Sequence, residues 1–190
     1  MRRLLFDPIG ARLIRFTRAQ STEGPTPDFE VRIDDDVIAF CELKSPRDDW
    51  LENELDAAEP GEFAGGARPD PTFNRISRRF AKAVSQFDRV NSGRTVPNIL
   101  VFVNHAAASH FGDLVETLTG NFHTSDGQTI PTMRHISEQR LGNCRQKVDV
   151  CIWVDGNSQR IQGFFFGPDH AHRTKLCELF KLDQAAISNA

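Results

Sequence analysis

Two neighbouring segments with strand-like patterns, residues 29–33 and 37–44, constrain the fold of this chain more than any other feature. In the first segment Phe, Val and Ile alternate with charged residues, a period of two that is typical of a half-buried strand. The second segment, VIAFCELK, is apolar on both faces until Glu42, which is typical of a central strand covered on both sides. Because only three aspartates, residues 34–36, lie between the segments, we expect a hairpin within a larger sheet.

The rest of the 190 residues shows further helix and strand patterns. Apolar spacing predicts helices over 4–20, 71–91, 110–120 and about 169–182, and strands over 98–104, 147–155 and 161–167. A shorter helix is expected in the acidic stretch 47–66, with Trp50, Leu51 and Leu55 as its apolar anchors. This order predicts an α/β fold, a mixed central sheet flanked by helices, in a single domain of residues 1–190.

The composition limits where the protein acts and what it binds. The sequence has no apolar run near the roughly 18 residues of a membrane span and no signal-peptide core, so we expect a cytoplasmic protein without a membrane partner. The formal charge of −3 provides no overall attraction for nucleic acid, which leaves only a local basic patch for that role. The four cysteines show no CxxC spacing, and we expect buried free thiols.

The hairpin carries three ionisable side chains at positions where a core is expected. If residues 34–36 form a three-residue loop, counting back along both strands puts Asp28 directly opposite Glu42. Like charges so placed repel each other. Lys44, two residues further along the strand than Glu42, shares the same face. A two- or four-residue loop would instead turn Asp28 toward the other face of the sheet.

A divalent cation would compensate the repulsion between the two carboxylates. Mg²⁺ takes oxygen ligands, typically one or two carboxylates with waters, so Asp28 and Glu42 are candidate ligands and the backbone carbonyl of Leu43 is a third. Lys44 would orient or help to deprotonate the attacking water. This assembly is suited to hydrolysing a phosphodiester. The alternative is a surface ion pair between Glu42 and Lys44 at a strand end, worth about 0–1 kcal/mol.

The charged residues of the hairpin resemble a known sequence motif. Pro27-Asp28, followed by Glu42-Leu43-Lys44 at the end of the next strand, resembles the PD-(D/E)XK motif of the restriction-endonuclease-like nuclease superfamily. The resemblance implies that Asp28 and Glu42 bind catalytic Mg²⁺, for which Mn²⁺ can substitute. It also implies that Lys44 serves the attacking water and that the substrate is DNA.

The resemblance implies a fold as well, a restriction-endonuclease-like α-β-β-β-α-β core. Here that core spans about residues 4–104 and is completed by the strands and helix of 147–182. One strand of the core is not evident in the sequence, unless it lies before Pro27 or within residues 59–72. Several families of the superfamily carry a glutamine on the helix after the lysine strand, and Gln86 resembles it as an organiser of the catalytic site.

The helix predicted over 71–91 has a basic side, although the protein as a whole is acidic. The candidates for binding nucleic-acid phosphates are Arg75, Arg78, Arg79 and Lys82. The alternative is a solvated helix face whose charges are partly paired with the acidic residues of 48–62. The segregation of charge is clear from the sequence, but its purpose is not.

Together these features predict a metal-dependent nuclease that hydrolyses a phosphodiester, of DNA by implication of the resemblance, through attack by water. The alternative is a catalytically inactive nuclease-like domain that binds nucleic acid or a protein partner. A third hypothesis is a component that cuts only with a separate recognition subunit. Whether the protein forms a homodimer to cut two strands is left open.

Overall fold

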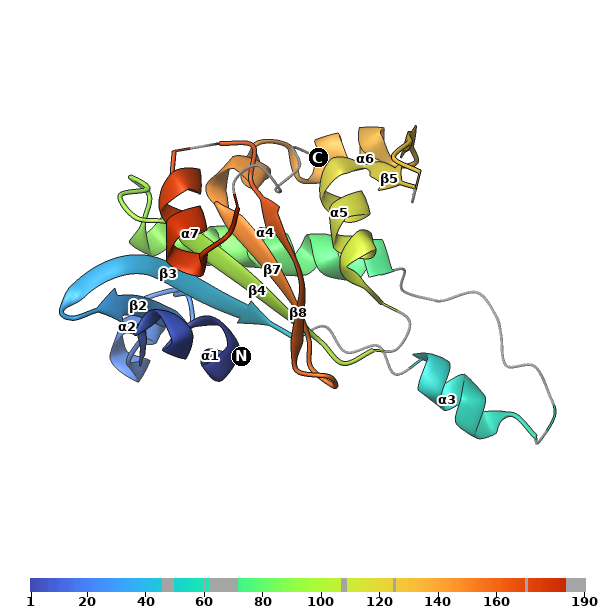
Figure 1. Cartoon of the computed structure of the whole chain (residues 1–190), viewed down its shortest axis with the longest axis horizontal. Coiled ribbons are helices and arrows are strands. Elements are labelled where there is room, and N and C mark those ends of the chain that lie inside the picture. The colour runs from blue at the N-terminus through green and yellow to red at the C-terminus, as the bar shows by residue number, and fades with distance from the viewer. Residues whose placement is uncertain are drawn as a thin grey trace.

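Strands and helices follow one another along the chain, and the computed structural model describes residues 1–45, 50–59, 61, 72–106, 109–124, 126–169 and 171–183 (Figure 1). The described strands are β1 (Arg12–Arg15), β2 (Phe29–Ile33), β3 (Asp36–Lys44), β4 (Asn98–Asn104), β5 (Asn121–His123), β6 (Thr129–Pro131), β7 (Val150–Asp155) and β8 (Arg160–Phe166). The described α-helices are α1 (Arg2–Leu5), α2 (Arg18–Thr22), α3 (Trp50–Ala57), α4 (Thr72–Val90), α5 (Phe111–Thr119), α6 (Arg134–Arg140) and α7 (Arg173–Phe180). Two 3₁₀ helices, η1 and η2, cover Asp7–Ile9 and Gly142–Lys147.

One mixed sheet contains six of these strands in the order β1–β2–β3–β4–β7–β8, and β5 pairs with β6 in a separate hairpin. Neighbours among β1, β2 and β3 are antiparallel, whereas β3, β4 and β7 run parallel. At the other edge β8 is antiparallel to β7. A parallel pair needs a long crossover connection, and α4 lies in the one between β3 and β4. The predicted α/β class with a mixed sheet flanked by helices is confirmed.

Helices cover both faces of the sheet. In Figure 1, α4 crosses behind the sheet, and α1 and α7 lie in front of it. Behind the sheet, α4 and α5 pack on a core cluster that includes Phe80, Phe87, Leu100, Leu114 and Trp153. In front, α1 and α7 pack on a second cluster that includes Leu5, Val31, Cys41, Ile152 and Leu176. The central strands are therefore buried on both sides, as the apolar run of β3 predicted.

The helix predicted over residues 4–20 is wrong. The chain leaves the helical conformation at Gly10, which ends η1 with a left-handed φ of 69° that glycine adopts without strain. After it β1 pairs with β2, and α2 begins only after Thr17, whose side chain forms a capping box with Gln20. The apolar residues that suggested one helix therefore belong to several short elements. One of them, β1, is a strand that lies before Pro27.

The predicted three-residue loop at 34–36 is also wrong. The turn contains two residues, because Ile33 pairs with Asp36. A β-bulge further from the turn then adds one residue to β3 and shifts the register, so that Phe29 pairs with Cys41. This is the alignment that a three-residue loop would have produced. The turn is one residue shorter than predicted and the bulge adds one residue to β3, so the two differences cancel. Asp28 and Glu42 therefore face each other as predicted.

Most of the other predicted elements are confirmed, with boundaries shifted by a few residues: α4, α5, α7, β4, β7 and β8. The short helix expected within 47–66 is α3, although the side chains of its predicted anchors lie outside the described ones. The small elements between α5 and β7 were not predicted. All four cysteines are free and three of them are buried, as expected.

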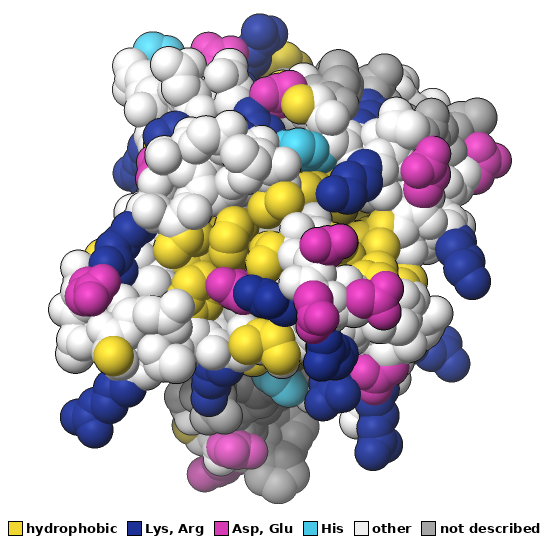
Figure 2. Space-filling model, turned by 90° about the vertical axis from the view of Figure 1, so that its left-hand side faces the viewer, with side chains coloured by type: hydrophobic (Ala, Val, Ile, Leu, Met, Phe, Trp, Pro, Cys, Tyr) yellow, Lys and Arg dark blue, Asp and Glu magenta, His cyan; other side chains and the backbone are white. Residues whose placement is uncertain are grey.

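The side of the molecule on which the β2–β3 turn lies (Figure 1) has an apolar band on its surface. Seen from that side, a band of hydrophobic side chains is bordered by charged ones (Figure 2). Ile33 and Ile38, which flank the turn, are only partly buried against the second core cluster. Among the described helices, none combines the length and the apolar character needed to cross a membrane.

A buried ion pair fixes the start of β4. Asp149, buried just before β7, accepts hydrogen bonds from the backbone N–H of Asn98 (2.7 Å) and from the guanidinium of Arg94. The same guanidinium donates to Asp169, whose side chain is 42% exposed. Burial raises the pKa of Asp149, whereas the backbone hydrogen bond from Asn98 and the charge of Arg94 oppose that rise. The carboxylate thus ties the loop before β4 to the strand beside it.

We expect Asp149→Ala to lower the free energy of unfolding by about 3 kcal/mol, because the Arg94 charge and the Asn98 N–H lose their buried partner. Asp169→Ala removes the exposed partner of the same arginine and should change that free energy by about 0–1 kcal/mol. Urea unfolding followed by circular dichroism measures both variants. Equal losses in the two would contradict the role given to the buried carboxylate.

Candidate functional site

Four of the side chains predicted from the sequence lie together between β3 and α4. Asp28 directly precedes β2, Glu42 and Lys44 lie near the end of β3, and Gln86 belongs to α4. Phe40, Glu42 and Lys44 share one face of β3 because side chains alternate along a strand. Since Phe40 packs against the core cluster under α4, this face points toward the helix. The strand therefore brings Glu42 and Lys44 beneath α4.

Two reciprocal hydrogen bonds hold the carboxylates in place. The backbone N–H of Asp28 donates to Oε2 of Glu42 (2.8 Å), and the backbone N–H of Leu43 donates to Oδ2 of Asp28 (2.9 Å). Each bond joins the side chain of one strand to the backbone of the other, just beyond the last paired residues of the ladder. The carboxylates therefore stay opposite each other in spite of their like charge.

Lys44 connects these carboxylates to α4. Its Nζ donates to Oε1 of Glu42 and to Oε1 of Gln86, the second at 2.9 Å. From Nε2, Gln86 in turn donates to the backbone carbonyl of Thr26 (2.6 Å). A continuous network of hydrogen bonds thus runs from the helix through the site and back to the segment before β2. All four residues predicted as catalytic belong to it.

The Glu42–Lys44 ion pair is buried. The two side chains are 3% and 7% exposed, so the alternative of a surface ion pair is wrong. Burial raises the pKa of Glu42, the hydrogen bond and charge of Lys44 lower it, and the charge of Asp28 raises it again. When both carboxylates are ionised, the cluster holds one more negative charge than positive. The lysine alone does not balance it.

The oxygen atoms of the cluster fit a hard divalent cation. The N–H and C=O groups of a strand residue point to the same neighbouring strand, so the Leu43 carbonyl faces the side on which Asp28 accepts the Leu43 N–H. Carboxylate and carbonyl oxygens, completed by waters, are the ligands that Mg²⁺ takes. Asp28, Glu42 and Leu43 can therefore supply oxygen ligands to one ion.

The described part of the chain contains no group of three or more His, Cys, Asp or Glu side chains that could hold a metal ion. The candidate site accordingly offers two carboxylates, Asp28 and Glu42, and any further ligand must come from backbone, water or substrate oxygens. Mg²⁺ commonly binds in this way, since it keeps several waters and uses one or two carboxylates.

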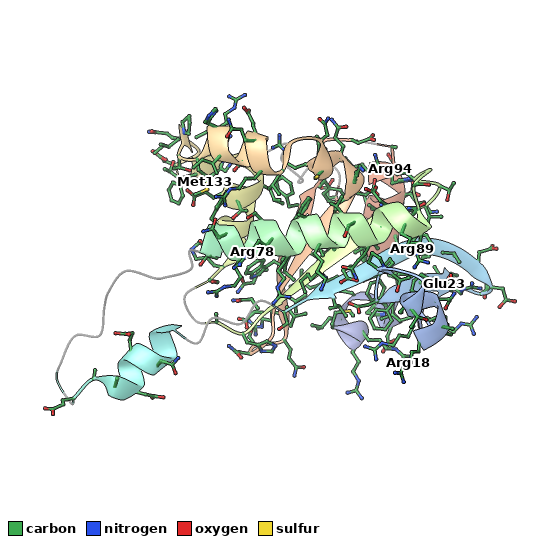
Figure 3. All side chains as sticks on the ribbon, turned by 180° about the vertical axis from the view of Figure 1, so that it is seen from behind. Arg18, Glu23, Arg78, Arg89, Arg94 and Met133 are labelled. Carbon is green, nitrogen blue, oxygen red and sulfur yellow. The ribbon has the colours of Figure 1, made fainter. Side chains whose placement is uncertain are left out.

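The basic residues of α4 continue the line of Gln86 along the helix. Lys82, Arg79 and Arg75 precede Gln86 by 4, 7 and 11 residues, which are close to whole turns of an α-helix. Arg78 lies beside this line, near the start of α4, and Arg89 lies near its end (Figure 3). We call the residues Arg75, Arg78, Arg79 and Lys82 the basic stripe. It runs from the buried network toward the beginning of α4.

Most side chains of the basic stripe are exposed to solvent and can contact a ligand. Arg78, Arg79 and Lys82 are exposed, and Arg75 is half-buried. No carboxylate within the described ranges pairs with Arg79 or Lys82. By contrast, Arg89 at the far end of α4 donates to the backbone carbonyls of residues 20 and 24 and pairs with Glu23, so it anchors α2.

Sequence reasoning missed the partner that orients the glutamine. Thr26 contributes only its backbone carbonyl, which accepts the hydrogen bond from Gln86 across 60 residues of chain. A backbone contact of this kind leaves no side-chain pattern in the sequence. The glutamine was found through a resemblance, whereas its orientation required the structure.

The comparisons with known proteins yielded no relative. No family model matches the chain, and no curated protein and no solved structure matches it either. The chemistry of the site is therefore argued from its geometry.

We expect Lys44→Met to lower the free energy of unfolding by roughly 3–5 kcal/mol, because Glu42 then stays buried without its cation. Adding Glu42→Gln should restore most of that loss, since it removes the uncompensated charge. Urea unfolding in the presence of EDTA measures both variants. A double variant as unstable as the single one would mean that packing of the lysine side chain, rather than charge, sets the stability.

Proposed function

We propose that this protein is a metal-dependent nuclease that hydrolyses phosphodiester bonds of DNA, with the chemistry of PD-(D/E)XK enzymes. The observation that carries the proposal is the hydrogen-bonded network in which Glu42, Lys44 and Gln86 are buried and Asp28 is half-buried. Burying a carboxylate and an ammonium beside a second, half-buried carboxylate is costly unless their charges are compensated. An ordinary core position would be occupied by apolar residues, whereas a metal-binding catalytic site requires these groups.

The order of the elements supports a restriction-endonuclease-like core. An α-helix, three antiparallel strands, a long helix and a parallel fourth strand occur in this order as α1, β1 to β3, α4 and β4, with the short helices α2 and α3 inserted between β1 and β2 and between β3 and α4. The strand that the sequence left unassigned corresponds to β1. This order is compatible with the α-β-β-β-α-β core that the motif implies.

A Mg²⁺ ion bound by Asp28, Glu42 and the Leu43 carbonyl would supply Lewis-acid charge to the scissile phosphate. Lys44 has three N–H donors, of which Glu42 and Gln86 accept two. The third can hold the attacking water by its oxygen atom. Gln86, itself fixed by a backbone carbonyl, keeps the ammonium aimed in one direction.

The basic stripe of α4 supports binding of the phosphate backbone. Exposed cations beside the candidate site would neutralise phosphates and release their counterions. The net charge of −3 offers no such general attraction. The basic stripe would therefore bind a DNA strand next to Asp28 and Glu42.

Hydrolysis of plasmid and single-stranded DNA tests the proposal. With Mg²⁺ or Mn²⁺ we expect cleavage that EDTA abolishes, and a loss of about 10²-fold or more in Asp28→Asn and in Lys44→Gln, as is typical when a group that stabilises the transition state is removed. Asp35→Asn, an exposed carboxylate in the turn of the same hairpin, and the exposed Lys175→Gln serve as matched controls. Circular dichroism verifies that each variant is folded. Full activity in both site variants would overturn the assignment.

The basic stripe gives a separate prediction. We expect Arg79→Gln and Lys82→Gln to weaken binding of DNA to a similar degree for all sequences and each to reduce the salt dependence of log K by about 1. Arg3→Gln changes the same charge on α1, on the opposite side of the sheet, and should leave binding unchanged. Fluorescence anisotropy over a range of NaCl concentrations, with EDTA present, measures all three. An equal effect of Arg3→Gln would mean that only net charge matters.

A catalytically inactive nuclease-like domain is the second candidate. It is favoured by the small number of carboxylates in the site, since no cluster of three metal-binding side chains occurs in the described ranges. This candidate would bind DNA through the stripe and would not cleave it with any divalent cation. An inactive domain should bind DNA without cleaving it, both alone and after candidate partner subunits are added. An enzyme that needs a recognition subunit should begin to cleave when that subunit is added.

A further inference from the structure

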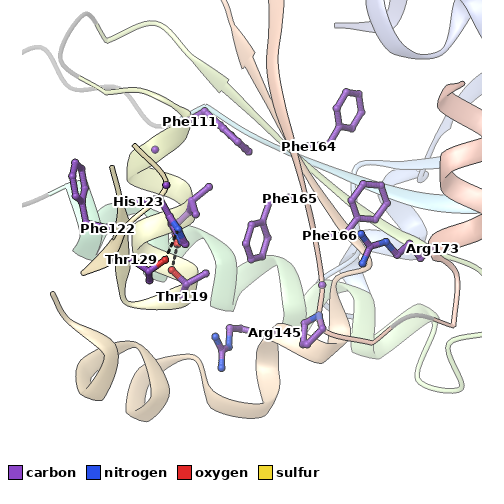
Figure 4. Close-up of a pocket in the computed structure, with 15 residues that line it drawn as sticks. Phe111, Thr119, Phe122, His123, Thr129, Arg145, Phe164, Phe165, Phe166 and Arg173 are labelled. Carbon is purple, nitrogen blue, oxygen red and sulfur yellow. Dashed lines mark hydrogen bonds between the residues drawn. The ribbon is translucent and has the colours of Figure 1, made fainter. Parts of the chain in front are cut away.

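A large pocket lies away from the Asp28–Glu42 site, where β8, α5 and the β5–β6 hairpin meet (Figure 4). Its volume is about 890 Å³, within the range of small-molecule sites. The described residues that line it are Phe111, Gly112, Val115, Thr119, Phe122, His123, Gly127, Thr129, Arg145, Phe164, Phe165, Phe166, Gly167, Pro168 and Arg173. None of them belongs to the buried network or to the basic stripe.

The charge of this lining favours an anion. It contains Arg145, Arg173 and His123 but no Asp or Glu, although acidic residues outnumber basic ones in the whole chain, 26 to 23. Nη1 of Arg145 donates to the backbone carbonyl of Leu118 (2.8 Å), which holds the guanidinium at the wall. No carboxylate of the described residues forms an ion pair with Arg145, and its buried Nε has no hydrogen-bond partner there. The positive charge at this wall is therefore available to a ligand.

The same lining favours a flat, apolar group beside the anion. Phe165 projects from β8 toward α5, whereas Phe166 lies under the guanidinium of Arg173, 5.4 Å from it (Figure 4). Phe111 reaches across β8 because residue 163 is glycine. A Cβ at Gly163 would approach the Phe111 ring to 2.5 Å. Phe111 and Phe165 thus lie on one side of the edge strand β8, and Phe166 with Arg173 lies on the other, so a planar group can stack on the rings of either side.

Polar side chains occupy the wall formed by α5 and the hairpin. Oγ1 of Thr129 lies 3.3 Å from Nδ1 of His123, and Thr119 lines the same wall. Hydroxyl and imidazole groups can both donate and accept hydrogen bonds. The Thr119 hydroxyl is already bonded to backbone groups of residues 115 and 121, whereas the exposed Thr129 and His123 share one hydrogen bond and retain capacity for the edge of a heterocyclic base.

We propose that this pocket binds a nucleotide, with its base against the phenyl rings and its phosphate at Arg145 and Arg173. The proposal goes beyond the nuclease function and does not depend on it. The same chemistry is offered by a free mononucleotide and by an unpaired nucleotide of a DNA strand. Aromatic stacking together with arginine charge is the usual mode of binding for single-stranded nucleic acid.

Calorimetry on the full chain in EDTA tests the pocket, with deoxyadenosine 5′-monophosphate and a single-stranded pentanucleotide as separate probes. We expect binding that Arg173→Gln weakens by about tenfold or more, as is typical of a lost charge-assisted hydrogen bond. Lys175→Gln removes the same charge from the exposed side of α7 and should have no effect. Phe122→Ala should also weaken binding, whereas Ile130→Ala should not. These two side chains pair across the hairpin and are similarly exposed, at 45% and 46%, but only Phe122 lines the pocket.

The outcomes separate the sources of the ligand. Binding of the mononucleotide alone identifies a free nucleotide, and tighter binding of the pentanucleotide that Arg173→Gln weakens but Arg79→Gln does not identifies an unpaired nucleotide of a DNA strand. The proposal is overturned if neither probe binds, if dodecanoate or inorganic phosphate binds as tightly as the mononucleotide, or if Arg173→Gln and Lys175→Gln behave alike. Because EDTA excludes hydrolysis from the measurement, a failure of the nuclease proposal leaves this result unaffected.

Discussion

The pair of hydrogen bonds between Asp28 and residues 42 and 43 determines everything that the site can do. Each bond uses a backbone N–H of one strand and a carboxylate of the other, so the site is part of the sheet rather than an addition to it. The register of the hairpin decides whether these bonds can form, because a shift of one residue would send Asp28 to the opposite face. The bulge in β3 is therefore as important to the site as the carboxylates themselves.

Burial under α4 fixes the orientation of the side chains in the site. Lys44 and Glu42 lie under α4 with little exposure, and the glutamine above them is fixed by a backbone carbonyl. In such surroundings a charge–charge contact is much stronger than in water, and an unpaired charge is correspondingly costly. The side chains are thus preorganised on one side, by α4, and in the proposed nuclease a bound cation would balance their charge. This preorganisation is what catalysis by electrostatic stabilisation requires.

Periodicity predicted the parts of the fold in which one pattern extends over several turns or a whole strand. The long helix α4 and the strands β3, β4 and β7 are of this kind, and all were found. The segment before Pro27 was misread because Pro8 and Gly10 divide it into elements too short to show a period of their own. The three-residue strands β5 and β6 were missed for the same reason. Length, rather than composition, set the limit of prediction.

The charged residues of the candidate site could be predicted from the sequence, but most of their contacts could not. The charged residues of β3 stood out because they interrupt an apolar strand, and counting across the turn brought Asp28 to the correct position although the loop was one residue shorter than assumed. That success depended on a bulge that nothing in the sequence indicated. The backbone contact of Gln86 and the pocket beside β8 had no signal either, since their residues come together from distant segments. Spacing within one hairpin can be read from a sequence, whereas contacts between separate elements cannot.

The distribution of charge connects the two proposed binding regions. The chain is acidic overall, so its net charge repels a polyanion, and attraction is restricted to places where cations gather. The basic stripe of α4 and the pocket at β8 are two such places, on different elements but on helices and strands of the same core. Electrostatic repulsion by the net negative charge makes these regions more selective. A DNA strand that approaches in another orientation gains no favourable electrostatic energy. An acidic protein can therefore bind nucleic acid in a defined orientation with only a few well-positioned cations, and its negative net charge contributes to that specificity.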